Sequence, residues 1–285
     1  MKKTVLIIVS VIFFHCIAMA QKPQGYSLDK GMKIEVMSSV TQVITQTVEG
    51  QNYETSTEIV TSDQFEVMEV LDNGYKIKMT GMYRTLGMQA PGQKMEMDSR
   101  KEGDSNLAYR ALTGKSFQFE MDNKGKLLSF EGLDDYYAAI KLELTGTVLE
   151  GSIETVIESI SEATLTSGLD GQFYIYPNSN EATWNRTTKT VANNLPVTIS
   201  SEFTWDSDNS ILAAGEMLLE GTTTVQGMAM STSMKGVQNT IFDLDRGTGL
   251  STLIQTQQRL SGKMEMQGMS IPMELTTTTK VIFKW

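Results

Sequence analysis

Residues 273–285 read MELTTTTKVIFKW, and their alternation decides the fold. Starting at Met273, every second position is apolar or threonine, and the positions between are mostly charged or threonine, with Ile282 as the exception. Successive side chains of a β-strand point to opposite faces of its sheet, so this period of two indicates a strand that buries one face. The stretch predicts a long strand at the end of the chain.

The same period of two occurs in both halves of the chain. It runs from Gly31 to about Phe130 and returns after Gly168. Turn signals such as Asp72-Asn73-Gly74 separate the alternating runs, and the spacing between runs is short. Short connections are typical of hairpins, because parallel strands need longer crossovers. We therefore expect antiparallel pairing in both halves.

Between these halves the apolar period changes to that of a helix. Apolar residues recur every three or four positions in two segments, near 132–145 and near 152–164. Asp134 and Asp135 stand in the first turn of the first segment, where the helix dipole favours anions, and Ser152 is a candidate N-cap of the second. We predict two amphipathic helices that cover one face of the sheet.

The predicted fold class is therefore mainly β, with one large curved antiparallel sheet, half-barrel or sandwich-like, and two helices from the middle of the chain on one face. We expect a single domain over residues 21–285. A chain of this length can bury a sizeable core without disulfides.

The N-terminus has the three parts of a cleaved export signal. Lys2 and Lys3 give a basic start, residues 5–14 are apolar, and Ala18-Met19-Ala20 fits the cleavage rule before Gln21. The apolar run is shorter than the roughly 20 residues of a membrane-spanning helix. We expect residues 1–20 to be removed and the mature protein to reach the periplasm or associate with the outer membrane.

Removal of the signal would also remove His15 and Cys16, the only histidine and cysteine in the chain. Nucleophile systems built on these residues, disulfides and Cys or His zinc sites would then be absent. The paired carboxylates, Asp134-Asp135 and Glu154 with Glu158, fall on the solvent-facing sides of the predicted helices, so we interpret them as solvated surface and not as a catalytic acid pair. We predict no catalytic residues, no metal site, no cofactor and no enzymatic activity.

The formal net charge of −10 becomes −12 once the two lysines of the signal are removed. This acidity argues against nucleic acid as a partner, because phosphates would be repelled.

Methionine is the one residue type in marked excess. Seventeen of the 19 methionines follow the signal, and twelve of these fall in three clusters, each with a Met-x-Met pair. Residues two apart in a strand share a face, and thioethers suit pockets for variable apolar ligands, irregular core gaps or Cu(I). Core packing and an apolar site both remain open. The predicted ligand-binding residues are the three pairs and two tyrosines that would supply hydroxyls at the mouth: Met95, Met97, Met228, Met230, Met264, Met266, Tyr136 and Tyr137.

A family resemblance rests on several features. These are a Lys30-Gly31 start to the first long strand, a Phe-x-Phe-x-Met-Asp-x-x-Gly hairpin at 117–125, central helices, and then Tyr176-Pro177 and Trp184 opening the second β half. In this layout the chain resembles a family of exported Gram-negative envelope proteins, a domain of unknown function, and the resemblance implies no activity. The order of elements is also similar to the lipoprotein-carrier (LolA-like) half-barrel, which implies a curved sheet closed by helices over an apolar cavity.

Three functions compete on this basis. The first is an exported binding or carrier protein for a lipid or other apolar small molecule. The second is a structural or envelope-assembly protein that contacts other envelope proteins. The third is an outer-membrane β-barrel, suggested by the aromatic C-terminus Phe283-Lys284-Trp285. Aromatic residues make up only 8% of the chain, and barrels need aromatic girdles, so we prefer the carrier.

Overall fold

The computed structural model describes residues 22–179, 181–192, 195–225, 228–266 and 268–285. The predicted export signal, residues 1–20, lies outside these ranges.

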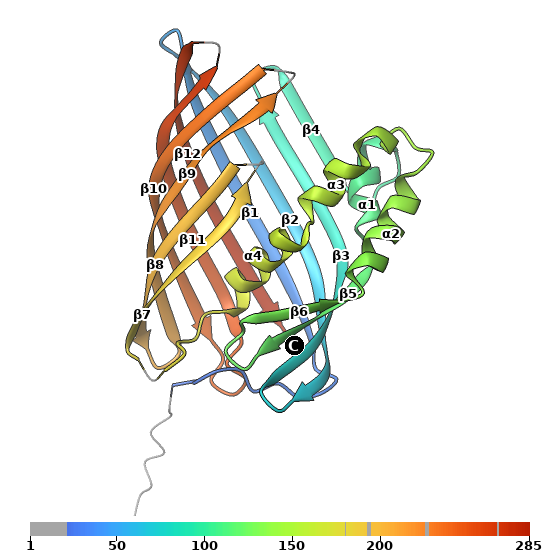
Figure 1. The fold of residues 1–285 in the computed structure, drawn as a ribbon, viewed down its shortest axis with the longest axis vertical. Coiled ribbons are helices and arrows are strands. Elements are labelled where there is room, and N and C mark those ends of the chain that lie inside the picture. Colours follow the sequence, from blue (N-terminus) through green and yellow to red (C-terminus); the bar gives the residue numbers. More distant parts are fainter. Residues whose placement is uncertain (1–21, 180, 193–194, 226–227, 267) are drawn as a thin grey trace, which may run out of the picture.

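One antiparallel sheet contains the twelve strands of the described residues, which confirms the predicted fold class. The spatial order is β6-β5-β3-β2-β1-β12-β11-β10-β9-β8-β7, with β4 paired to β3 alone, so the sheet is open (Figure 1). The strands are β1 (Lys33–Val48), β2 (Gln51–Leu71), β3 (Gly74–Ala90), β4 (Gln93–Asp98), β5 (Ser116–Asp122), β6 (Leu127–Glu131), β7 (Thr183–Ala192), β8 (Leu195–Ser207), β9 (Ser210–Val225), β10 (Met228–Leu244), β11 (Ser251–Met266) and β12 (Met269–Lys284).

The quoted C-terminal stretch lies at the centre of this sheet. It forms most of β12, which pairs with β1 on one side and β11 on the other. The predicted alternation is seen in burial, because Thr277, Val281 and Phe283 are buried whereas Thr276, Thr278, Lys280 and Lys284 of the other face are exposed.

The helices differ from the prediction in two respects. The first predicted helix is α2 (Leu133–Leu144), but the second is divided into α3 (Ile153–Ser159) and α4 (Glu162–Phe173), so one helix over 152–164 was wrong. The division falls at Ser161, whose extended backbone (φ −56°, ψ 159°) is typical of an N-cap. A short helix, α1 (Leu107–Ala111), was not predicted.

The helix α4 also continues through Gly168, where we expected β structure to return. Glycine is unfavourable inside a helix, but the last turn of α4 buries Leu169 and Phe173. The Phe173 ring packs against Phe65 of β2 and Phe283 of β12, with centroid distances of 5.4 and 6.0 Å. Tertiary packing therefore outweighs the local preference and holds α4 across the inner face of the sheet, the face that it covers (Figure 1).

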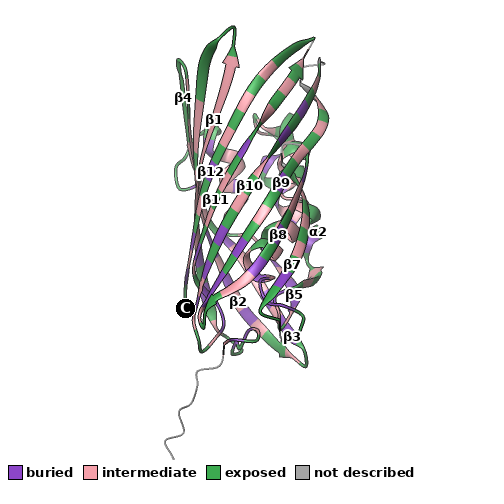
Figure 2. Ribbon diagram, turned by 90° about the vertical axis from the view of Figure 1, so that its left-hand side faces the viewer, coloured by how far each residue is buried: buried purple, intermediate pink, exposed green. Residues whose placement is uncertain are grey.

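Buried residues concentrate toward one end of the strands, and the opposite hairpin ends are mostly intermediate or exposed (Figure 2). The large cluster at the buried end joins both halves of the sheet with α2, α4 and the segment before β1. Tyr26 of that segment donates its hydroxyl hydrogen to the carbonyl of Phe173 at 2.7 Å, and its backbone N–H bonds to Asn123 O at 2.8 Å. The segment before β1 therefore ties the end of α4 to the β5–β6 turn within this core.

Gly125 in the β5–β6 turn lies in tight contact with α4. Its φ is +88°, and a Cβ at this position would lie 1.9 Å from the carbonyl oxygen of Phe173. Gly114 has a similar φ of +74° but open space around the same position.

We predict that Gly125→Ala destabilises the protein more than Gly114→Ala. Both changes place a side chain on a left-handed backbone, at a cost of about 1–2 kcal/mol. Only the first forces a methyl group into the Phe173 carbonyl, which should add roughly 1–3 kcal/mol, as overpacking does. Urea unfolding of the two variants measures the difference directly. Equal loss in both would contradict the close docking of α4.

Candidate functional site

A belt of polar side chains, interrupted at Gly215 of β9, crosses the middle of the inner face. Residues directly opposite one another in paired strands share a face, so the register identifies the rows of the belt. We call these residues the polar belt; they occupy two neighbouring rows, Arg186, Ser201, Gln238, Gln258, Thr277 and Gln42 in one and Thr240, Thr256 and Thr279 in the other.

Members of the polar belt bond to one another across the strands. Gln258 donates from Nε2 to Oε1 of Gln238 at 2.7 Å, and the hydroxyls of Thr240 and Thr256 lie 3.0 Å apart. Thr240 is buried and Thr256 is half-buried. Buried polar groups are costly unless they are paired, so these bonds are what make a polar row tolerable inside the fold.

Apolar residues lie on both sides of the belt. Toward the buried end come Phe242, Ile254 and Val281 of the main core. Toward the other end comes a second apolar cluster, which consists entirely of strand residues: buried Val197, Met217, Met234 and Leu260, with partly buried Ile199, Leu219, Met273 and Leu275. The inner face is thus apolar, then polar, then apolar along the strands.

A cavity of about 790 Å³ lies between α4 and the polar belt. We call it the chamber. This volume is within the range of small-molecule sites. Its wall combines apolar and polar groups contributed by α4 and by β7 to β12, among them Thr166, Asp170, Tyr174, Arg186, Ile199, Phe203, Ala213, Gln238, Thr240, Phe242, Thr256 and Gln258.

Arg186 of β7 is the charged group held most firmly in the chamber wall. Its Nη2 donates to the carbonyl of Tyr176 at 3.1 Å, and its guanidinium carbon lies 3.4 Å from the Tyr174 ring centroid and 5.2 Å from that of Phe203. Its Nη1 is buried and has no hydrogen-bond partner among the described residues. Burial lowers the pKa of this guanidinium, while Tyr174 and the charge of Asp170 act in the opposite direction. Arginine remains protonated in proteins, so the chamber wall holds a cation with one unpaired donor.

Asp170 of α4 lines the same chamber. Burial raises the pKa of its carboxyl group, while a hydrogen bond from the backbone N–H of Leu127 (3.1 Å) and the charge of Arg186 act in the opposite direction. The carboxylate is therefore already engaged in holding α4 to β6.

The structure brings the predicted methionines to the same inner face but outside the chamber. Met230 lies opposite Met266, and Thr232 next along the strand lies opposite Met264, near the hairpin ends of β9–β10 and β11–β12. Met95 lies opposite Met88 of β3, Met88 lies opposite Thr57 of β2, and Thr57 lies opposite Gln42 of the polar belt, so Met95 shares the inner face. Met95 is exposed, whereas Met97, Met230, Met264 and Met266 are half-buried; the side chain of Met228 is outside what the structure describes.

The two predicted tyrosines also lie away from the chamber. Tyr136 is buried, with its ring 5.2 Å from that of Phe117, and Tyr137 donates its hydroxyl hydrogen to the carbonyl of Ile160 at 3.0 Å. Both tie α2 to neighbouring elements.

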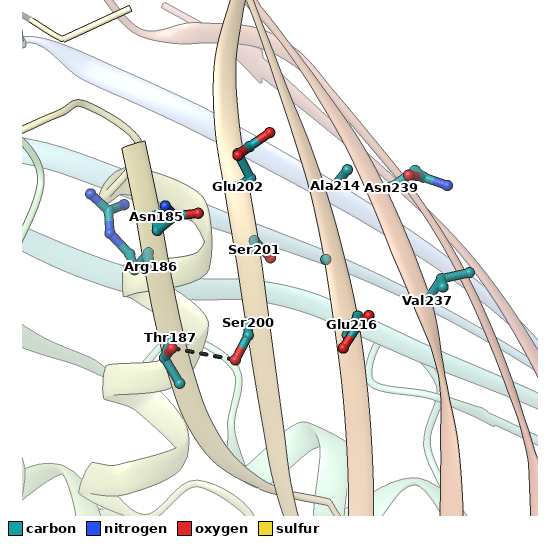
Figure 3. A pocket seen from close by; sticks show the side chains of 11 residues that line it. Asn185, Arg186, Thr187, Ser200, Ser201, Glu202, Ala214, Glu216, Val237 and Asn239 are labelled. Carbon is teal, nitrogen blue, oxygen red and sulfur yellow. Dashed lines mark hydrogen bonds between the residues drawn. The ribbon is translucent and has the colours of Figure 1, made fainter. Parts of the chain in front are cut away.

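A second hollow, of about 590 Å³, lies on the outer face of β7 to β10 (Figure 3). Asn185, Thr187, Ser200, Glu202 and Glu216 line it with exposed side chains, and Thr187 and Ser200 share a hydrogen bond of 3.3 Å. Solvated side chains on the outward positions of a sheet are ordinary surface. The chamber, which is backed by α4 and contains a buried unpaired donor, is the better candidate site.

Arg186, Gln238 and Gln258 were not singled out from the sequence. Their only signal is a polar residue at an inward position of a strand that also has apolar inward positions, such as Gln238 between Met234 and Phe242. That signal can be recognised only when the register of the neighbouring strands is known.

Two features are absent from the described ranges. No three His, Cys, Asp or Glu side chains there come together as a metal site requires. No helix there is long and apolar enough to cross a membrane.

Comparison with known proteins identifies the family. A model described as "Family of unknown function (DUF6263)" matches residues 72–251, more than half of the chain, so the chain belongs to this family. The expected membership of a family of unknown function is thereby confirmed. No curated protein matches the chain.

Among solved structures, one of lipovitellin that concerns its lipid–protein interactions is similar with a TM-score of 0.52 and 10% identity. The match covers 91% of this chain but only 26% of that chain, so this protein spans about a quarter of the lipovitellin chain's length. The likeness concerns the fold alone.

Two other matches have TM-scores too low to support an argument. An outer membrane channel from Pseudomonas putida F1 has 9% identity, coverage of 91% and 97% of the two chains, and a TM-score of 0.25. An outer membrane lipoprotein-sorting protein domain from Vibrio parahaemolyticus has 10% identity, coverage of 90% and 85%, and a TM-score of 0.14.

We predict that the polar belt does not contribute to stability. Thr240→Val alone should cost about 1 kcal/mol, because it removes the partner of the Thr256 hydroxyl. The double variant Thr240→Val with Thr256→Val leaves neither hydroxyl unpaired and keeps the side-chain shape, so it should be as stable as the wild type or more so. Thermal and urea unfolding measure both. A double variant less stable than the single one would show that the belt is structural.

Proposed function

We propose that this member of the family binds or carries an apolar small molecule on the inner face of its sheet and is not an enzyme. The observation that carries the proposal is the chamber between α4 and the polar belt, whose wall continues into the second apolar cluster. Ligand sites of this kind are mainly apolar and have a few polar groups that fix orientation.

The methionines extend the same surface. Met264 and Met266 lie beyond the second apolar cluster on the inward positions of β11, and both are half-buried. Flexible, polarisable thioethers adapt to ligands of varied shape. The lipovitellin structure concerns lipid–protein interactions in that protein, and its fold likeness is consistent with a lipid as the ligand here.

A second candidate is an envelope-assembly role through protein contacts. It is favoured by apolar side chains exposed on the outer face of β9 and β10, namely Leu212, Leu218, Val237 and Ile241. Exposed apolar residues near one another are a feature of interaction surfaces. This role uses the opposite face of the sheet, so variants on the inner face separate the two proposals.

For the ligand proposal, we predict that Ala213→Leu abolishes binding and that Ala214→Leu does not. The two residues are neighbours on β9, but Ala213 is buried in the chamber wall and Ala214 is exposed on the outer face. A leucine at 213 would fill part of the chamber. Binding is measured by the fluorescence of a phenylnaphthylamine dye and its displacement by unlabelled oleate.

The melting temperature of both variants serves as the control, since overpacking at position 213 costs about 1–3 kcal/mol. If the folded Ala213→Leu variant binds as well as the wild type, the chamber is not the site.

The proposal also includes export to the periplasm or its outer-membrane boundary. It is supported by the basic start, apolar run and Ala18-Met19-Ala20 of the N-terminus. We predict that intact mass measurement of the protein from the cell envelope gives a chain that begins at Gln21. A mass that includes His15 and Cys16 would contradict both export by cleavage and the histidine-free mature chain.

A further inference from the structure

We propose that the chamber binds the anionic head group of a long-chain amphiphile, a carboxylate on an acyl chain, and that Arg186 is the residue that recognises it. This inference rests on the proposed function and specifies the class of its ligand.

The first argument is the free donor of Arg186. Three neighbours contact the guanidinium: the Tyr176 carbonyl accepts from Nη2, and the rings of Tyr174 and Phe203 flank it. Its Nη1 is buried without a partner in the described part of the chain. A buried donor left unpaired costs free energy, and more so when it is charged. A carboxylate accepts from guanidinium N–H groups in a matched planar geometry, so it would remove this cost.

The second argument is that no carboxylate of the described residues bonds directly to Arg186, although the charge of Asp170 acts on it. Asp170 lines the chamber, but its Oδ1 accepts from the backbone of Leu127, and no ion pair joins it to Arg186 among the described residues. The other charged groups that line the chamber are Glu162 and Lys189, and both are exposed. Among the described residues that line the chamber, Arg186 is thus the one cation that is partly removed from water, where a charge is screened least.

The third argument is the order of chemistry along the strands. The polar belt begins beside Arg186, and the second apolar cluster follows it on the inward positions of β8 to β12. From Ser201, which lies opposite Arg186, to Val197 of the cluster is four residues along β8, or about 14 Å at the rise of an antiparallel strand. One acyl chain spans about 15 Å of a bilayer, half of its hydrocarbon thickness. A head group at Arg186 therefore leaves room for a chain of about this length along the cluster.

The test compares oleate with oleyl alcohol, which has the same chain but no charge. Displacement of the phenylnaphthylamine dye from the purified protein at pH 8 gives the relative affinity of each. We expect the wild type to bind oleate about tenfold or more tightly than the alcohol, because a hydrogen bond to a charged group is worth at least that factor. Arg186→Gln should bind both compounds equally, at the level that the wild type shows for the alcohol.

Lys189→Gln is the matched control. It removes one positive charge from the same strand and the same chamber, but from an exposed side chain, so it should keep the preference for oleate. Arg186→Lys keeps the charge without the planar fork and should keep only part of the preference. If Arg186→Gln lowers the melting temperature so far that binding is lost, the role of Arg186 is tested by comparing the preference for oleate over oleyl alcohol in the wild type and in Arg186→Lys. A preference that is unchanged in Arg186→Lys would contradict recognition by the planar guanidinium.

The outcomes separate this inference from the function on which it rests. Equal binding of oleate and oleyl alcohol by the wild type, or an unchanged preference in Arg186→Gln, overturns the role of Arg186 and leaves an apolar-ligand protein. Binding of neither probe overturns the proposed function as well.

Discussion

The pairing of the first strand with the last is the interaction on which the rest of the structure depends. β1 and β12 run side by side from Glu35–Lys284 to Gln46–Met273, and this pairing joins the strands before the helices to those after them. A shift of one residue would exchange the inner and outer side chains of every strand beyond it. Phe283 would then leave Phe173 of α4, and the polar belt would be broken between Gln42 and Thr277. The same pairing therefore secures both the core and the candidate site.

The inner face uses this register for two different purposes. At the buried end, aromatic packing around Phe173 stabilises the docking of α4. In the middle, the same helix lies over glutamine and threonine side chains, which pack less favourably than leucine or valine would. The hydrogen bond between Gln238 and Gln258 offsets part of that cost without making the belt a source of stability. A polar layer that packs less favourably at such a position is consistent with a role in binding, because departures from favourable packing often mark functional sites.

The sequence predicts the strands and α2 well because their signals are local. The alternation of 273–285 and the helical period of 133–144 need only a few neighbouring residues to be read. The continuation of α4 through Gly168 could not be predicted in this way, since Phe173 is stabilised by residues from β2 and β12. The chamber was missed for the same reason. Arg186 and Gln258 are 72 positions apart in the chain and share a row of the sheet only through four strand pairings, whereas the methionine pairs are visible within three residues.

The curvature of the sheet explains how the second apolar cluster is buried although it contains no helix residue. Gly236 of β10 lies in the row between Met217 and Leu260, and a Cβ there would come within 1.8 Å of the carbonyl oxygen of Arg259. The backbones of β10 and β11 are therefore in direct contact at a position where any other residue would hold them apart. Around this contact Met217, Met234 and Leu260 are buried by strand residues alone. The inner face thus combines an end whose burial depends on the docking of α4 with an end whose burial depends on the pairing of the strands.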